Sequence, residues 1–408
     1  MADVLDLSKL FKIQVPAQMA YDDPIVVIED QQDLRLIIVH HLQKMTFSNV
    51  KHVANGYEAL ELLSDQKGIM TFICDLDMPV MGGLDLLGEL RERTDIERGP
   101  FLLTMDHVSK EKAMLAVENG VDDILAKPFT YADIIPKLRN AFKLFHNPKN
   151  PEKVYELAKR SLRGNDLVAA EKIYTILADA SPKSARPWVG LARIALAKDD
   201  LKGARNLLNE AEKRNSNYVH VYAMRGDILV KEQNWEEALA AFKKAISLSP
   251  LNPMRYRVAA ELLFKVKRFQ DAANLLEEAI KHSLEFKELY HFLSQAHFAL
   301  KDYGKAARFI RSALTSDPHN VTFLNQLGIS LKESQQLDEA TKIYNQIIKL
   351  EPDNMAALYN KAILLNTKGE LPEAIKLLER VVRKYPDFTQ ASQKLQEFRK
   401  LTPNSGAA

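Results

Sequence analysis

Five polar side chains in the first third of the chain each stand directly after, or at the end of, a short apolar run: Glu29, Asp30, Asp75, Thr104 and Lys127. Carboxylates that are packed together repel one another, so they need a cation, and Mg²⁺ with oxygen ligands and retained waters suits such a cluster. A bound metal would also neutralise charge on an incoming phosphoryl group and make Asp75 a nucleophile toward phosphorus. The Thr104 hydroxyl and the Lys127 ammonium are then placed to bind phosphoryl oxygens.

The elements that must position these residues follow from the alternation of two patterns. Short β-branched and apolar runs predict five strands, at Ile25–Ile28, His52–Ala54, Phe72–Cys74, Phe101–Leu103 and Ile124–Ala126. Stretches with helical spacing follow each of them, at Leu34–Leu42, Tyr57–Leu63, Leu84–Glu92, Lys110–Glu118 and Ala132–Phe145. This order predicts an α/β domain, a doubly wound parallel sheet with helices on both faces. Ligands bind beyond the carboxyl ends of such strands, where the polar residues fall.

The pattern resembles the CheY-like receiver domain of two-component response regulators over residues 24–145. The matching residues are Glu29-Asp30, Asp75-Leu76-Asp77-Met78-Pro79, Gly82-Gly83, Thr104 and Lys127-Pro128-Phe129. The resemblance implies that Asp75 is the phosphoacceptor, and that Glu29, Asp30, Asp75 and the backbone carbonyl of Asp77 hold Mg²⁺. It also implies a cis peptide between Lys127 and Pro128. Two other interpretations stay open: strand-end carboxylates that are merely solvated, and a degenerate receiver that is not phosphorylated.

One residue departs from the family pattern. The family usually carries an aromatic residue three places before the lysine, and this chain has Ile124 there. We therefore expect that movement of Thr104 repacks the face formed by the fourth helix, fifth strand and fifth helix without an aromatic gate. Asp77 and Asp106 add two acids at the pocket mouth, either to influence hydrolysis of the acyl phosphate or as ordinary exposed loop residues.

The rest of the chain repeats with a period of 34 residues, in seven blocks from 151 to 388. The twentieth residue of every block is alanine: Ala170, Ala204, Ala238, Ala272, Ala306, Ala340 and Ala374. The eighth is always small: Ala158, Ala192, Gly226, Ala260, Ser294, Gly328 and Ala362. Small residues recur where two helices cross closely, so each block predicts a helical hairpin. The blocks resemble tetratricopeptide (TPR) repeats, which form an α-helical superhelix, and residues 389–408 are expected to add a capping helix and a tail.

The first helices of such repeats line a groove that binds segments of other proteins. Seven cations of the first four blocks are candidates for this partner groove: Lys159, Arg163, Arg186, Arg193, Lys231, Arg257 and Lys265. Only Glu152, Asp227 and Glu261 oppose them, which favours an acidic partner segment. The alternative is that these are ordinary solvated charges.

Composition limits the remaining possibilities. Lys and Arg (56) nearly balance Asp and Glu (54), which argues against a nucleic-acid-binding protein. The single cysteine, Cys74, excludes an internal disulfide and favours the cytoplasm. No apolar run has the length of a membrane span or the form of a signal peptide. Residues 146–150 are expected to be a linker, and residues 1–23 either a flexible arm or a short helix from Val4 to Ile13.

These observations predict a bacterial response regulator that a sensor histidine kinase or a phosphotransfer protein phosphorylates on Asp75. Its TPR domain would act as output by binding an unidentified protein, without DNA binding. Formation of a homodimer through the receiver is an alternative route to output. No enzyme activity is expected beyond the receiver's own phosphotransfer and autodephosphorylation. The alternatives are a constitutive adaptor scaffold with a degenerate receiver, and a nucleic-acid-binding regulator that uses the basic groove.

Overall fold

The computed structural model describes residues 24–401 except 46, 65–67, 94–95, 148–149, 285 and 287. The expectations for residues 1–23 and for the tail after residue 401 lie outside the described residues. The chain forms two compact units, one of residues 1–228 with 247–251 and one of residues 229–246 with 252–408. Each unit is described separately.

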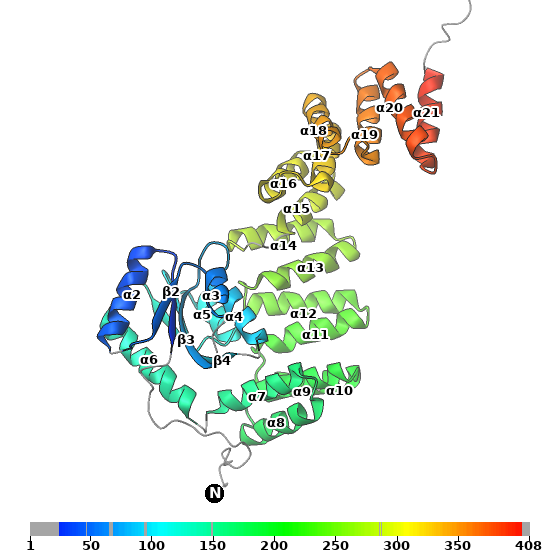
Figure 1. Ribbon diagram of the computed structural model, residues 1–408. Coiled ribbons are helices and arrows are strands. Elements are labelled where there is room, and N and C mark those ends of the chain that lie inside the picture. The colour runs from blue at the N-terminus through cyan, green and yellow to red at the C-terminus, as the bar shows by residue number, and fades with distance from the viewer. Residues whose placement is uncertain are drawn as a thin grey trace, which may run out of the picture. The chain divides into compact units, whose positions relative to one another are not determined.

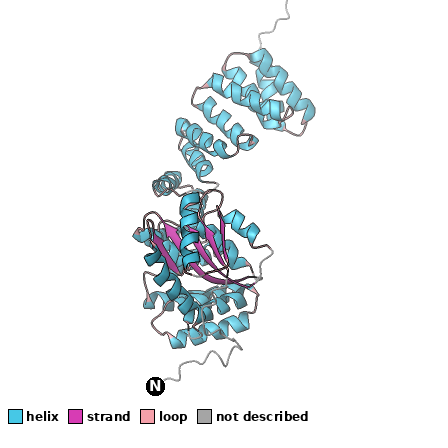
Figure 2. Ribbon diagram, turned by 60° about the vertical axis from the view of Figure 1, so that its left-hand side comes forward, coloured by secondary structure: helices cyan, strands magenta, loops and turns pink. Residues whose placement is uncertain are grey.

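The first unit contains a parallel five-stranded sheet with the strand order β2-β1-β3-β4-β5 (Figure 2). The strands are β1 (Ile25–Ile28), β2 (Val50–Val53), β3 (Gly68–Asp75), β4 (Ile96–Met105) and β5 (Asp123–Ala126). The sequence prediction placed all five strands but made β3 and β4 too short. Only their buried apolar centres give a sequence signal, whereas backbone pairing continues on either side, from Gly68 opposite Ile96 to Asp75 opposite Thr104.

Helices cover both faces of this sheet. They are α2 (Gln32–Lys44), α3 (Gly56–Leu62), α4 (Gly83–Glu92), α5 (Lys110–Glu118) and α6 (Tyr131–His146). On one face, Ala59 of α3, Leu87 of α4 and Ala116 of α5 share a buried core with Phe72. On the other face, α2 and α6 contribute Ile38, Leu42, Ile134 and Leu138 to a second core. The predicted doubly wound α/β domain is confirmed.

Helices alone make up the described chain after residue 150 (Figure 1). They are α7 (Pro151–Arg163), α8 (Leu167–Ala180), α9 (Arg186–Ala197), α10 (Leu201–Arg214), α11 (Val219–Lys231), α12 (Trp235–Leu248), α13 (Pro253–Lys265), α14 (Phe269–Lys281), α15 (Leu289–Ala299), α16 (Tyr303–Ser316), α17 (Val321–Glu333), α18 (Leu337–Leu350), α19 (Met355–Thr367), α20 (Leu371–Lys384) and α21 (Thr389–Leu401). Successive helices pack on one another from α7 to α10 in the first unit and from α13 to α21 in the second. This arrangement confirms the predicted helical repeats.

The small residues lie where the repeat pattern requires them. All seven alanines at the twentieth place of the blocks are completely buried. At the eighth place, a Cβ atom added to Gly328 would lie only 2.7 Å from the ring of Tyr344 in the second helix of the same repeat. The helices therefore cross so closely that a larger side chain would not fit.

In each repeat, one residue between the two helices has a left-handed backbone conformation. The fifteenth residue of every block has a positive φ, from 57° at Lys267 to 83° at Gly369. The other five are Asn165, Asp199, Gln233, Lys301 and Gln335. Left-handed residues commonly end helices and are usually glycine. This feature could not be predicted from the sequence, because six of the seven places hold a residue other than glycine.

Among the described residues, we find no helix that combines the length and the apolar character needed to cross a membrane.

Candidate functional site

The strand ends bring the predicted residues to one edge of the sheet. Glu29 follows β1 directly, Asp75 ends β3, and Thr104 lies opposite Asp75 in the neighbouring strand β4. Lys127 follows β5, and its backbone N–H donates to the carbonyl of Met105 at the end of β4. Because the strands are parallel, their carboxyl ends meet there, and side chains far apart in the sequence become neighbours.

Lys127 lies at the centre of the cluster. Its Nζ atom is 2.9 Å from Glu29 Oε2 and 3.0 Å from Asp75 Oδ1. The Thr104 hydroxyl donates to the same Asp75 Oδ1 atom at 3.3 Å. Glu29, Asp75 and Thr104 are buried, whereas Asp106, whose Oδ1 atom is 3.8 Å from Lys127 Nζ, is exposed. The cluster therefore holds two buried acids, with one ammonium between them.

Burial controls the protonation of the cluster. Burial raises the pKa of the Glu29 and Asp75 carboxyls, and hydrogen bonds from Lys127 offset this only in part. Burial acts in the opposite sense on Lys127, but its bonds to both carboxylates prevail and its pKa is raised. Both carboxylates thus lack stabilisation in their charged forms, and a further cation would supply it.

The acids also form the one group of at least three potential metal-binding side chains that we find among the described residues. One carboxylate oxygen each from Glu29, Asp30 and Asp75 lies within 4.8 Å of the others. Asp30 is exposed and faces water, whereas the other two are buried. Three oxygen donors, one of them open to solvent, fit a small hard cation that keeps some of its water ligands, as Mg²⁺ does.

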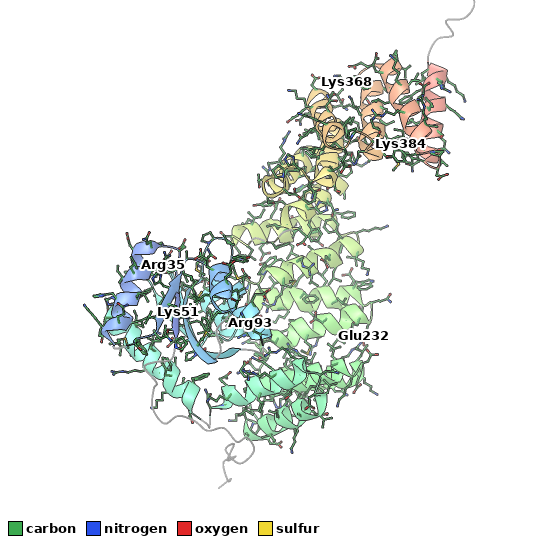
Figure 3. All side chains as sticks on the ribbon, viewed as in Figure 1. Arg35, Lys51, Arg93, Glu232, Lys368 and Lys384 are labelled. Carbon is green, nitrogen blue, oxygen red and sulfur yellow. The ribbon has the colours of Figure 1, made fainter. Side chains whose placement is uncertain are left out.

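The main chain around the acids is held in place from two sides. The guanidinium of Arg35 on α2 (Figure 3) donates to the backbone carbonyls of Glu29 and Asp30. After Asp75, the N–H of Leu76 donates to the carbonyl of Thr104 at 2.9 Å, and the N–H of Gly83 returns to the carbonyl of Leu76 at 3.0 Å. A Cβ atom on Gly83 would lie 2.3 Å from the Asp75 carbonyl, which explains the need for glycine there.

The loop after Asp75 contains a residue that sequence reasoning missed. Val80 has φ +72°, a left-handed conformation that costs a β-branched residue free energy, and its side chain is exposed. The N–H of Met81 donates to the carbonyl of Pro79 across it, at 2.9 Å. This tight turn lies next to the candidate site, where such strain is often concentrated.

Lys112 of α5 is a second residue that the sequence did not suggest. Its Nζ atom lies 2.9 Å from Asp77 Oδ2, two residues after Asp75. The two residues are 35 apart in the sequence, and no local pattern connects them.

The cis peptide predicted between Lys127 and Pro128 is present.

Most of the seven candidate groove cations have partners within the chain. Lys159 pairs with Glu156 at 2.6 Å, Arg257 pairs with Glu261 at 2.9 Å, and Arg186 forms two bonds to Glu152. Lys265 lies over the ring of Trp235. Arg163, Arg193 and Lys231 are exposed. Two of the three opposing acids, Glu152 and Glu261, therefore neutralise two of the seven cations.

Comparison with known proteins agrees with both parts of the chain. The family model of the response regulator receiver domain matches residues 25–139. Models of tetratricopeptide repeats match residues 153–255, 257–321 and 331–397. Chemotaxis protein CheY-3 of Vibrio cholerae is 31% identical over 120 residues, which are 29% of this chain and 91% of that protein. A CheY homologue of Campylobacter jejuni is 28% identical over 116 residues, 28% of this chain and 89% of that protein.

Among solved structures, the Naa15/Naa10 complex bound to HypK-THB resembles the chain with a TM-score of 0.51 and 16% identity. The match covers 62% of this chain and 40% of that one, and it supports the helical-repeat fold alone. The residues at the edge of the sheet and the relatives of the first domain lead to one conclusion. The chain belongs to the response regulators, with a receiver domain followed by tetratricopeptide repeats.

Proposed function

We propose that this protein is a phosphorelay response regulator in which Asp75 accepts a phosphoryl group from a histidine kinase or a phosphotransfer protein. The observation that carries the proposal is the cluster of two buried acids around Lys127, with the Thr104 hydroxyl on the same Asp75 oxygen. The TPR domain then serves as the output by binding another protein. The receiver supplies no turnover beyond its own phosphotransfer and dephosphorylation.

The residues of the cluster have distinct parts in the transfer. A carboxylate oxygen of Asp75 forms the new bond to phosphorus while the bond from phosphorus to the donor breaks, and the electron pair of that bond stays with the donor. The Lys127 Nζ atom, which lies 3.0 Å from Asp75 Oδ1, then forms an ion pair with the phosphoryl oxygens. The Thr104 hydroxyl, which donates to Asp75 beforehand, donates to a phosphoryl oxygen afterwards.

Glu29, Asp30 and Asp75, with the carbonyl of Asp77 that the family resemblance adds, would hold Mg²⁺. When bound, the ion neutralises charge on the acids and on the incoming phosphoryl group. The raised pKa values of Glu29 and Asp75 support this assignment, because they reveal two carboxylates whose charge is poorly compensated.

The test uses the full chain with acetyl phosphate and Mg²⁺, and detects the phosphoprotein by intact mass. Wild type should gain one phosphoryl group, and the gain should be lost without Mg²⁺ and in Asp75→Asn. Asp85→Asn, which removes an exposed acid on α4, is the matched control and should be phosphorylated normally. No labelling of wild type, or equal labelling of Asp75→Asn, would leave an adaptor scaffold as the better description.

Output by protein contact is favoured over nucleic-acid binding by the charges of the repeats. Lys159, Arg186 and Arg257 are neutralised by neighbouring acids, and the whole chain has a formal charge of only +2. These three of the seven candidate groove cations are therefore less available to displace counterions from a phosphate backbone. A pull-down that compares wild type with Asp75→Ala should recover a protein partner in phosphorylation-dependent amounts. Salt-sensitive retention on DNA or RNA would instead favour a nucleic-acid-binding regulator.

A further inference from the structure

Val80 combines two properties that each cost free energy. Its φ of +72° lies in the left-handed region, which a β-branched residue rarely adopts. Its side chain is 85% exposed, more than any other large apolar side chain that the structure describes. Glycine would adopt this conformation without steric strain, and asparagine with less strain than valine. The valine side chain therefore adds nothing to the core, and strained residues of this kind gather at functional sites.

The loop that contains Val80 begins and ends at Asp75. It starts with Leu76, and the N–H of Gly83 donates back to the Leu76 carbonyl at 3.0 Å. A Cβ atom on Gly83 would lie 2.3 Å from the Asp75 carbonyl, so the far end of the loop contacts Asp75 as well. Three peptide units separate Val80 from Gly83, which limits the distance between their Cα atoms to about 11 Å. A protein that approaches the Asp75 carboxylate therefore comes within reach of Val80.

The loop after β4 also exposes a valine beside the cluster. This loop borders the candidate site, because Asp106 Oδ1 lies 3.8 Å from Lys127 Nζ. Val108, two residues further on, is 42% exposed. The side chains of Asp77 and Asp106 are 72% and 80% exposed. The surroundings of Asp75 thus present two apolar side chains from separate loops, together with two carboxylates.

These side chains suit a protein donor and have no use for a small one. Acetyl phosphate needs only the Asp75 carboxylate and the groups around it, and it has no surface that could cover Val80. A protein that carries a phosphohistidine has to bring that side chain against Asp75, so the surface around its histidine covers the neighbouring loops. Apolar side chains of that surface would bury Val80, and a basic residue would pair with the exposed carboxylates.

We propose that Val80 is a contact residue for the protein that phosphorylates Asp75, and that its strained turn presents an apolar side chain to the donor surface around the phosphohistidine. The matching donor surface carries an apolar side chain and a basic residue next to that histidine. The proposal rests on the proposed function. Complete burial of a valine side chain corresponds to a change of about tenfold or more in affinity.

The test compares a protein donor with a small donor on the same full-length variants in the presence of Mg²⁺. Sensor kinases of the same organism are autophosphorylated with radiolabelled ATP, and the one that transfers fastest to wild type serves as the donor. Val80→Asn should lower kcat/KM for this donor about tenfold, chiefly through a higher KM, because a contact that acts in binding is lost. Val80→Thr, which keeps the shape of valine, should also lower it. Acetyl phosphate should label both variants at the wild-type rate.

Melting temperatures separate the contact from the backbone strain. Val80→Asn should unfold at a higher temperature than wild type, because asparagine tolerates the left-handed conformation. Val80→Thr keeps the β-branch and should gain no stability, so a loss of transfer in both variants cannot come from a change in strain. Val168→Thr is the matched control, since Val168 is 78% exposed on α8 of the repeats, and it should accept phosphate from the kinase like wild type.

Each other result has a definite meaning. Wild-type kcat/KM in Val80→Asn and Val80→Thr would overturn the contact, while labelling by acetyl phosphate still upheld the receiver function. An equal loss with acetyl phosphate would also overturn it, because Val80 would then act on the site rather than on the donor. Transfer from no kinase would overturn the contact and the assignment of a kinase donor together. No label from either donor would count against the proposed function itself.

Discussion

The carboxylate of Asp75 is more costly to bury than its single ammonium partner can offset. Burial raises its pKa, with Lys127 reducing that shift only in part. A group whose pKa is higher in the folded than in the unfolded state contributes its full stability below the unfolded pKa of about 4, and loses it as the pH rises through the folded pKa. At neutral pH the charged Asp75 carboxylate therefore destabilises the folded state.

Asp75→Asn should accordingly raise the melting temperature at pH 7, because it removes the buried negative charge. The gain should shrink as the pH is lowered below the pKa of Asp75, because the wild-type carboxyl is then neutral as well. Thermal unfolding at several pH values without Mg²⁺ measures this, with Asp85→Asn as a control in an exposed position. A gain that stays the same at acid pH would contradict the electrostatic explanation.

Thr104→Ala tests how the receiver changes its surface. The Thr104 hydroxyl donates to Asp75 Oδ1, and Ile124, which stands where the family usually carries an aromatic residue, is only partly buried in the core. We expect Thr104→Ala to bind beryllofluoride, a phosphoryl mimic, but to lose most of the resulting change in hydrogen exchange over α5, β5 and α6. Identical exchange changes in the variant and wild type would show that Thr104 does not transmit the signal.

At the residue scale, the sequence was informative wherever a strand ends. Glu29, Asp75 and Lys127 were predicted to meet because parallel strands align their carboxyl ends. In the structure, Lys127 Nζ lies 2.9 Å from Glu29 Oε2 and 3.0 Å from Asp75 Oδ1. The pairing of Lys112 with Asp77 had no such signal, since it depends on the tilt of a helix over a loop. The left-handed Val80 was also unforeseen, because valine rarely adopts that conformation.

Helix crossings in the repeats depend on single side chains. Gly328 of α17 lies against the ring of Tyr344 of α18, which is completely buried. Gly328→Ala would place a Cβ atom 2.7 Å from that rigid ring, so we expect a loss of about 1–3 kcal/mol. Urea unfolding followed by circular dichroism measures it.

A glycine in the preceding repeat gives the control. A Cβ atom on Gly304 of α16 meets nothing within 4 Å, so Gly304→Ala should leave stability unchanged or raise it by up to about 1 kcal/mol. Leucine stands in the place of Tyr344 in other repeats, as Leu208, Leu276 and Leu378. Tyr344→Leu should therefore restore part of the loss caused by Gly328→Ala; an equal loss in both backgrounds would argue against the ring contact.

At the element scale, the repeat period of 34 residues predicted the hairpins between α7 and α10 and between α13 and α20, because a close crossing requires a small residue at the same two places each time. The left-handed residue between the helices escaped detection. Asn, Asp, Gln and Lys occupy this place in six repeats. Only Gly369 is of the residue type that predicts a left-handed turn.

The last helix closes the hydrophobic core of the repeats. Ala391, Leu395 and Phe398 of α21 are buried in the same cluster as Leu378 and Val381 of α20. Stacked repeats gain stability from their neighbours, so an uncovered end is both less stable and prone to association.

Truncation before Thr389 should therefore lower the unfolding midpoint of the helical signal and produce larger species in size-exclusion chromatography. Phosphorylation of Asp75 should be unaffected, because each repeat depends on its nearest neighbours alone. Replacing the exposed Lys400 by Ala in the intact helix is a control that should change neither property. A truncated chain as stable and monodisperse as the full one would show that α21 does not cap the array.

At the scale of the whole molecule, the change from alternating strands and helices to a strict helical period predicted two kinds of domain. The hydrogen bond between Glu118 at the end of α5 and Ser249 in the turn after α12 could not be predicted, since it joins residues 131 apart in the sequence whose side chains are ordinary surface types. Only the fold brings the end of α5 to that turn.

Cys74 gives the molecule a built-in reporter. It is the single cysteine of 408 residues, it is fully buried in β3, and burial raises the pKa of its thiol well above the usual range. An alkylating reagent can reach it only when the central strand opens, and no other thiol in the chain competes for the reagent. The time course of alkylation thus records how often the receiver opens, because the repeats contain no cysteine. The rate can be compared with and without a phosphoryl mimic, and no engineered label is required.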